Sequence, residues 1–91
     1  MRILVTPTFS KFVKKISPGQ KKFLDKAVNS IVDNPNIGEE KVGDLAGVLI
    51  YKLRVQDQTW LLAYRQLSTE SIKLIMVGPH ENFDREIKKI V

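Results

Sequence analysis

Four basic or titratable side chains stand in a strand-rich part of the sequence where folding could bring them together. Lys52 and Arg54 are two residues apart, so on one strand both would emerge from the same face. Arg65 lies in the next apolar segment, and His80 follows a Gly-Pro pair. Converging cations would stabilise the charge of a phosphodiester, and an imidazole moves a proton near neutral pH. These four residues are the candidate catalytic set.

Three of these four residues also have an ordinary structural interpretation. Lys52 and Arg54 alternate with apolar neighbours, as residues on the solvent face of a half-buried strand do. His80 is placed where it would cap a final helix. Glu81 and Asp84 are weaker candidates for proton transfer. The residues alone leave open whether the cationic face is catalytic.

The composition excludes several kinds of chemistry. The chain has no cysteine and one histidine, so thiolate nucleophiles, disulfides and metal sites rich in Cys or His lack their residues. It also has no phosphate-binding glycine loop and no nucleophile elbow. We therefore expect neither a metal nor a cofactor. Because the apolar runs are too short for a membrane span, we expect a cytoplasmic protein without a membrane partner.

Charge is distributed unevenly along the 91 residues, whose formal net charge is +5. Residues 11–26 contain six lysines and one acidic residue, whereas residues 33–44 contain four acidic residues and one lysine. A basic run of this kind attracts nucleic acid or an acidic protein partner. The alternative is a pair of solvated, lysine-rich helix faces.

Alternating and β-branched apolar residues predict the strands that must position the candidate site. The predicted strands cover residues 2–6, 48–56, 59–67 and 71–78. Because short turns join the last three strands, these should form an antiparallel meander. Residues 34–47, which contain three glycines, are predicted to be the loop that precedes the meander.

Helical periodicity predicts the remaining elements. A short helix with Phe9, Phe12, Val13 and Ile16 on one face precedes a helix over residues 18–33, which Ser17 and Gln20 begin with a capping box. These two helices should form an αα-hairpin. The tail of residues 81–91 should form a last helix, with an apolar stripe made of Phe83, Ile87, Ile90 and Val91.

Residues 1–91 are therefore predicted to form a single α+β domain. Its N-terminal strand and αα-hairpin should pack on the antiparallel meander as a two-layer sandwich, followed by the C-terminal helix. The sheet residues expected in the core are Leu49, Leu53, Leu62, Tyr64, Leu74 and Met76. The helix residues expected to contact them are Phe12, Phe23, Val28 and Ile31.

Five short motifs follow one another along the chain. They are Lys41-Val-Gly-Asp-Leu-Ala-Gly47, Tyr51-Lys-Leu-Arg54, Leu61-Leu-Ala-Tyr-Arg65, Ile75-Met-Val-Gly78 and Gly78-Pro-His-Glu-Asn-Phe83. Their order and spacing resemble the RelE/ParE superfamily of bacterial toxins, with the last motif similar to a ParE-like subgroup. The resemblance covers essentially the whole chain.

The resemblance implies the toxin of a type II toxin–antitoxin pair, with a cognate antitoxin that wraps and neutralises it. Members are either ribosome-dependent mRNA endonucleases or inhibitors of DNA gyrase, so the expected target is the ribosome with its mRNA, or gyrase. In the nucleases, basic residues on the sheet neutralise the phosphate, and Lys52 and Arg54 match these. Leu61 stands where the nucleases carry an arginine, and Asp84 stands near a common tyrosine position.

Three functions follow from this reasoning. A nuclease would be a metal-independent endoribonuclease that uses Lys52, Arg54, Arg65 and His80. A ParE-like toxin would instead block gyrase or another target without catalysis. A nontoxic basic module that binds nucleic acid or an acidic protein is the third possibility.

Overall fold

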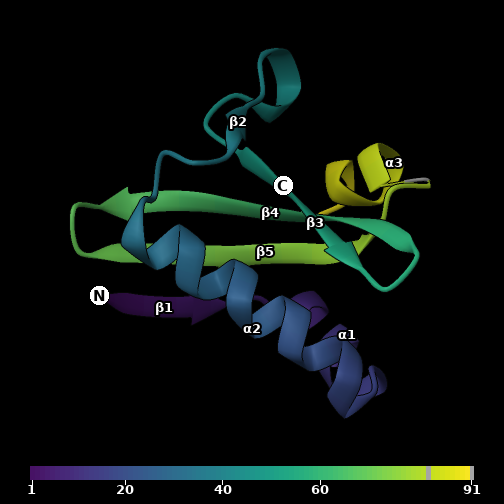
Figure 1. Cartoon of the computed structure of the whole chain (residues 1–91). Helices are drawn as coiled ribbons and strands as arrows, with labels where there is room; N and C mark the ends of the chain where they lie inside the picture. Colours follow the sequence, from purple (N-terminus) through teal and green to yellow (C-terminus); the bar gives the residue numbers. More distant parts are fainter. Residues whose placement is uncertain (82, 91) are drawn as a thin grey trace.

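The structure is a computed structural model that describes residues 1–81 and 83–90. Within these residues, five strands form one mixed sheet in the order β1-β5-β4-β3-β2 (Figure 1). The strands are β1 Arg2–Val5, β2 Glu39–Glu40, β3 Leu49–Val55, β4 Gln58–Ser68 and β5 Ser71–Pro79. The helices are α1 Pro7–Lys15, α2 Pro18–Asp33 and α3 Phe83–Lys88, with a 3₁₀ turn at Gly43–Leu45. The predicted α+β fold is confirmed.

Local capping explains where the hairpin helices begin. Thr6 Oγ1 accepts a hydrogen bond from the Phe9 amide at 3.1 Å, and Pro7 occupies the first turn of α1. At the start of α2, Ser17 Oγ accepts from the Gln20 amide at 3.2 Å and Gln20 Oε1 accepts from the Ser17 amide at 3.0 Å. The capping box predicted at α2 is therefore present.

Strand β1 lies parallel to β5 at one edge of the sheet, whereas β3, β4 and β5 form the predicted antiparallel meander. A bulge interrupts the meander, because Ala63 pairs with Met76 while Tyr64 pairs with Leu74, which leaves Ile75 as the extra residue. The Ile75 carbonyl accepts a hydrogen bond from the hydroxyl of Thr6. The residue that caps α1 thus also ties this helix to the bulge.

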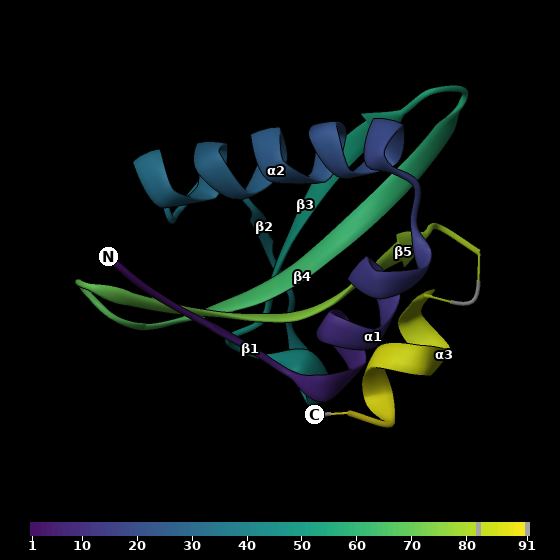
Figure 2. The same ribbon diagram turned by 90° about the horizontal axis from the view of Figure 1, so that it is seen from below.

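Helices cover both faces of the sheet, and two apolar clusters result (Figure 2). On one face, α1 and α2 bury the larger cluster, in which the rings of Phe12 and Trp60 make an edge-to-face contact with centroids 5.2 Å apart. On the other face, α3 buries a smaller cluster against the sheet, centred on Phe83 and Ile87. The α3 helix therefore covers part of the sheet face opposite the one on which α1 and α2 pack.

Two of the expected core residues lie elsewhere, and each has a physical reason. Phe23 is 41% exposed, because the buried stripe of α2 passes through Leu24, Ala27 and Ile31 instead. Met76 packs against the α3 cluster, because the bulge at Ile75 reverses the alternation that would have placed it beside Leu74. Val91, predicted on the stripe of the last helix, lies outside the described residues.

The segment between α2 and β3 is held by one buried tyrosine. The Tyr64 hydroxyl donates to the Pro35 carbonyl at 2.7 Å and accepts from the Gly38 amide at 2.9 Å. Burial raises the pKa of Tyr64 above its ordinary value of 10.0, and the hydrogen bond from Gly38 partly opposes this. The predicted loop contains strand β2, which pairs antiparallel with β3, and the 3₁₀ turn.

None of the helices in the described part of the chain is both long enough and apolar enough to cross a membrane.

Candidate functional site

Three of the four predicted site residues lie at one end of the sheet: Lys52 and Arg54 emerge from the face that α3 covers, and His80 directly follows β5. Arg54 pairs with Thr59 across β3 and β4, and the His80 amide donates to the Thr59 carbonyl at 3.2 Å. Arg54 and Thr59 therefore lie side by side on β3 and β4, and His80 lies next to Thr59 directly after the end of β5. With neighbouring strands about 4.8 Å apart, the backbones of Arg54 and His80 are about 10 Å apart. Lys52 emerges beside Arg54 from the same face.

We call Lys52, Arg54 and His80 the cationic row. All three side chains are exposed, and none forms a hydrogen bond or ion pair with another described residue. His80 and Thr59 border a depression of about 360 Å³, together with Glu81. The His80 carbonyl accepts from the Phe83 amide at 3.3 Å, so the backbone of His80 also begins the turn into α3. The arrangement places two cations and an imidazole at the same end of the sheet, although neither Lys52 nor Arg54 lines the depression beside His80.

Arg65 is not part of this row. It lies six residues along β4 from Thr59, which corresponds to about 20 Å of extended chain. Its Nη1 atom donates to the Ala46 carbonyl at 3.4 Å, beside Gly47. Gly47 has a φ of +88°, and a Cβ at this position would lie 2.5 Å from Nη1. Arg65 therefore packs over the segment that leads into β3.

The centre of the cationic face is apolar. Leu61 pairs with both Lys52 and Gly78, and it is only 6% exposed because it belongs to the α3 cluster. This position supplies no hydrogen-bond donor. Of the two weaker candidates, Glu81 shares the depression with His80, whereas Asp84 lines a different one with Lys41 and Lys88. No group of three or more His, Asp or Glu residues in the described chain could hold a metal ion.

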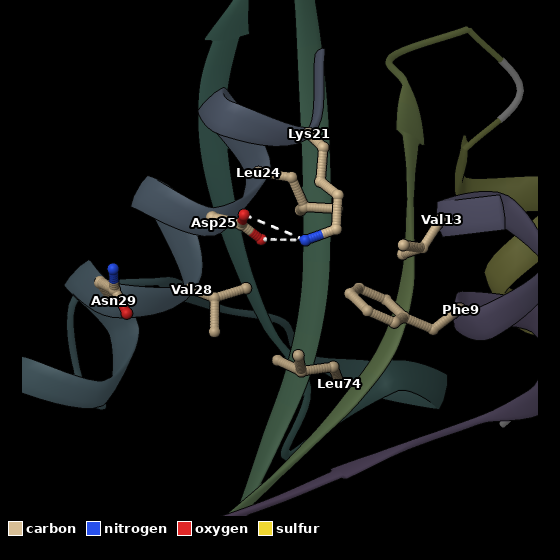
Figure 3. Close-up of a pocket in the computed structure, with 8 residues that line it drawn as sticks. All are labelled: Phe9, Val13, Lys21, Leu24, Asp25, Val28, Asn29 and Leu74. Carbon is tan, nitrogen blue, oxygen red and sulfur yellow. Dashed lines mark hydrogen bonds and ion pairs between the residues drawn. The ribbon is translucent and has the colours of Figure 1, made fainter. Parts of the chain in front are cut away.

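A second surface depression lies between the two hairpin helices (Figure 3). Its volume is about 490 Å³, and the side chains of Phe9, Val28 and Leu74 point into it. Lys21 and Asp25 form an ion pair with a nitrogen–oxygen distance of 3.1 Å at its rim. We call this depression the hairpin groove. It is an apolar surface flanked by the lysine-rich helices.

The sequence-based reasoning missed two residues that shape these surfaces. The sequence predicts Tyr64 only as a core residue, whereas its hydroxyl also holds the segment before β2 through hydrogen bonds. A buried tyrosine hydroxyl usually needs a hydrogen-bond partner, and this rule is the signal that points to the second role. Lys73 was not considered, although it is the Cα partner of Arg65. Counting residues back from the β4–β5 turn would have paired Arg65 with a residue near Lys73.

Comparisons with known proteins agree with this architecture. The family model described as "ParE-like toxin of type II bacterial toxin-antitoxin system" matches residues 3–88. A double mutant of the E. coli toxin RelE in the free state has a TM-score of 0.74 and 18% identity, over 98% of this chain and 90% of that one. One chain of the E. coli RelBE toxin–antitoxin complex has a TM-score of 0.71 and 20% identity, over 88% of this chain and 96% of that one. No curated protein sequence matches the chain significantly.

Proposed function

Because the chain belongs to the ParE-like toxins of type II bacterial toxin–antitoxin systems, and is thus the toxin of such a pair, we propose that it arrests growth by cleaving messenger RNA on the ribosome. The observation that supports this proposal is the cationic row of Lys52, Arg54 and His80 at one end of the sheet. Two cations and a proton-transfer group within reach of one phosphate are the parts that metal-independent RNA cleavage requires.

In the proposed reaction, the 2′-hydroxyl oxygen of the RNA attacks the adjacent phosphorus. The bond from phosphorus to the 5′-oxygen breaks, which yields a 2′,3′-cyclic phosphate and a 5′-hydroxyl. His80 accepts the proton of the attacking hydroxyl, and solvent supplies a proton to the leaving oxygen. Lys52 and Arg54 stabilise the extra negative charge on phosphorus oxygens in the transition state. Arg65 lies about 20 Å along β4 from Thr59, the partner of Arg54, and about 13 Å from Leu61, the partner of Lys52, and it has no part in this mechanism.

A second function is favoured by the buried Leu61, on the sheet face from which Lys52 and Arg54 emerge. Without a donor there, the cationic row could serve as a binding surface alone, as in a toxin that blocks DNA gyrase without catalysis. A binding surface needs charge complementarity but no proton transfer. The two functions therefore differ in whether the His80 imidazole is required.

The test combines Lys52→Ala with His80→Ala. Both side chains are exposed, so the double variant should keep its stability to within about 0.5 kcal/mol. We expect it to bind ribosomes, to leave mRNA uncut when cleavage is mapped by primer extension, and to lose toxicity. Lys26→Ala, at an exposed position on α2, is the matched control and should remain fully toxic. A folded double variant that stays fully toxic would refute the proposal that the protein is a nuclease. If DNA supercoiling fails before translation does when the toxin is expressed alone, the result would support a block of DNA gyrase.

The partner of the toxin is its cognate antitoxin. We propose that one antitoxin segment occupies the hairpin groove, because that groove is apolar and flanked by the lysines of α1 and α2. An amphipathic segment with acidic flanks would match both features. Charges at the rim of an interface act mainly on the association rate, so binding should be sensitive to salt.

A further inference from the structure

A second basic surface lies at the opposite end of the sheet from the cationic row. Arg65 on β4 and Lys73 on β5 are Cα partners, and Leu4 on β1 pairs with Lys73 from the other side. Like charges directly opposite each other on neighbouring strands destabilise a sheet. Neither residue forms an ion pair in the described chain, and Glu70 in the nearby β4–β5 turn pairs with neither of them. The pair therefore has no negative counterpart among the residues that the structure describes.

Arg65 makes one side-chain hydrogen bond within the described chain. Its Nη1 atom donates to the Ala46 carbonyl at 3.4 Å and lies beside Gly47. The other N–H groups of the guanidinium have no acceptor among the described residues. A guanidinium with these groups available can bind a carboxylate with two parallel hydrogen bonds.

Exposed apolar side chains surround the two cations. Leu67 is 48% exposed and Leu4 is 39% exposed, and both are large hydrophobic residues. Arg65, Lys73, Leu67 and Ile90 are among the residues that line a depression of about 270 Å³. In Figure 1 this end of the sheet, with the β4–β5 turn, lies beside the N-terminus and far from the start of α3. We call Arg65, Lys73, Leu4 and Leu67 the distal patch.

We propose that the distal patch binds an acidic, amphipathic segment of the antitoxin, and this proposal rests on the toxin–antitoxin partnership described above. The segment supplies a carboxylate to Arg65 and Lys73 and places an apolar side chain against Leu67. Charge complementarity and the exposed leucines both favour a peptide. RNA is less suitable, because single-stranded bases bind by stacking on aromatic rings, and the residues that line the depression include no aromatic side chain.

The test uses Lys73→Glu in the full chain and the purified full-length antitoxin as the probe. This substitution places opposite charges across β4 and β5, so the midpoint of thermal unfolding should rise. The equilibrium dissociation constant should nevertheless increase by about tenfold or more, because an interface carboxylate would now face another carboxylate. Arg85→Glu, which reverses one exposed charge on α3 and lines neither the hairpin groove nor the depression of the distal patch, is the matched control and should change the constant by less than about threefold.

Leu67→Ser provides an independent arm, because it removes apolar contact without changing charge. It should also weaken antitoxin binding by about tenfold. The proposal is overturned if antitoxin affinity stays within about twofold for both Lys73→Glu and Leu67→Ser, or if Lys73→Glu weakens ribosome binding while antitoxin affinity is unchanged. Antitoxin affinity does not depend on RNA cleavage, so failure of the proposed nuclease would leave this result unaffected.

Discussion

Replacing Gly38 with alanine should destabilise the fold strongly, although the change adds one methyl group. A Cβ at residue 38 would lie 2.8 Å from the Tyr64 hydroxyl oxygen, 2.9 Å from Tyr64 Cε1 and 3.1 Å from Leu49 Cβ. The tyrosine ring cannot move aside, because it is fully buried and its hydroxyl makes hydrogen bonds to Pro35 and Gly38. The added methyl group must therefore displace either the loop or the ring.

The magnitude follows from two contributions. Overpacking of a well-packed site costs about 1–3 kcal/mol. Displacing the loop also disturbs the hydrogen bond from Gly38 to Tyr64, and a typical hydrogen bond contributes about 1 kcal/mol. We therefore expect Gly38→Ala to lower the free energy of unfolding by about 2–4 kcal/mol. For a domain of this size, the midpoint of thermal unfolding would fall by about 8 °C or more.

The assay is urea unfolding followed by the fluorescence of Trp60, which is 2% exposed in the folded chain. Gly19→Ala is the matched control, because the nearest atom to a Cβ there is Ser17 Oγ at 3.9 Å. Its position in the first turn of α2 should make the control neutral or slightly stabilising. If both variants unfold within about 0.5 kcal/mol of the wild type, the assignment of Tyr64 as the anchor of this loop is refuted.

Three further predictions follow from burial and charge. Because the pKa of Tyr64 is raised above 10.0, the folded chain holds the phenol proton more tightly than the unfolded chain does. The contribution of the protonated Tyr64 to stability is complete below pH 10 and is lost as the pH rises through the folded pKa. In alkaline urea titrations, Tyr64→Phe should remove this loss of stability, whereas Tyr51→Phe should retain it. Leu53→Ala should lower the free energy of unfolding by about 2–5 kcal/mol, because Leu53 is buried. Phe23→Ala should lower it by less than about 1 kcal/mol, because this side chain is 41% exposed. Equal losses of unfolding free energy in the two variants would contradict the observed packing of α2 on the sheet. Neutralising four hairpin lysines together should slow antitoxin association at low ionic strength, and an unchanged rate would show that they form only a solvated face; these lysines are Lys14, Lys15, Lys21 and Lys22.

Secondary structure could be predicted from the sequence because its signals are local. The capping box at Ser17 and the 3.6-residue apolar period define α2 closely, and alternation together with short turns defines the meander. The predicted strand of residues 59–67 corresponds to β4 at Gln58–Ser68. These features depend only on neighbouring residues, so tertiary contacts were not needed to identify them.

Features that depend on long-range pairing could not be predicted in this way. The parallel pairing of β1 with β5 joins residues about 70 positions apart, and no local pattern encodes it. The bulge at Ile75 changes which face Met76 occupies, and the Thr6 hydroxyl that stabilises the bulge comes from the other end of the chain. Burial of Phe83 and Ile87 on the second sheet face likewise depends on the course of the chain after β5.

The candidate site shows the same division. Lys52 and Arg54 share a face because of the two-residue period of a strand, which the sequence alone predicts. The separation of Arg65 from them depends instead on the register of β3 against β4, in which Lys52 meets Leu61 rather than a residue near Arg65. Sequence order brings Arg65 into the same meander but does not say at which end of the strand it lies.

The two basic ends of the sheet should act independently. Along β4, Arg65 is about 20 Å from Thr59, the partner of Arg54, and about 13 Å from Leu61, the partner of Lys52. The buried residues Leu61 and Ala63 lie under α3. At physiological ionic strength, interactions between exposed charges are largely screened beyond about 8 Å. Substitutions in the cationic row therefore should not alter the electrostatic environment of Lys73, nor the reverse. Loss of toxin action and loss of antitoxin affinity are consequently separable by mutation, even within a domain of 91 residues.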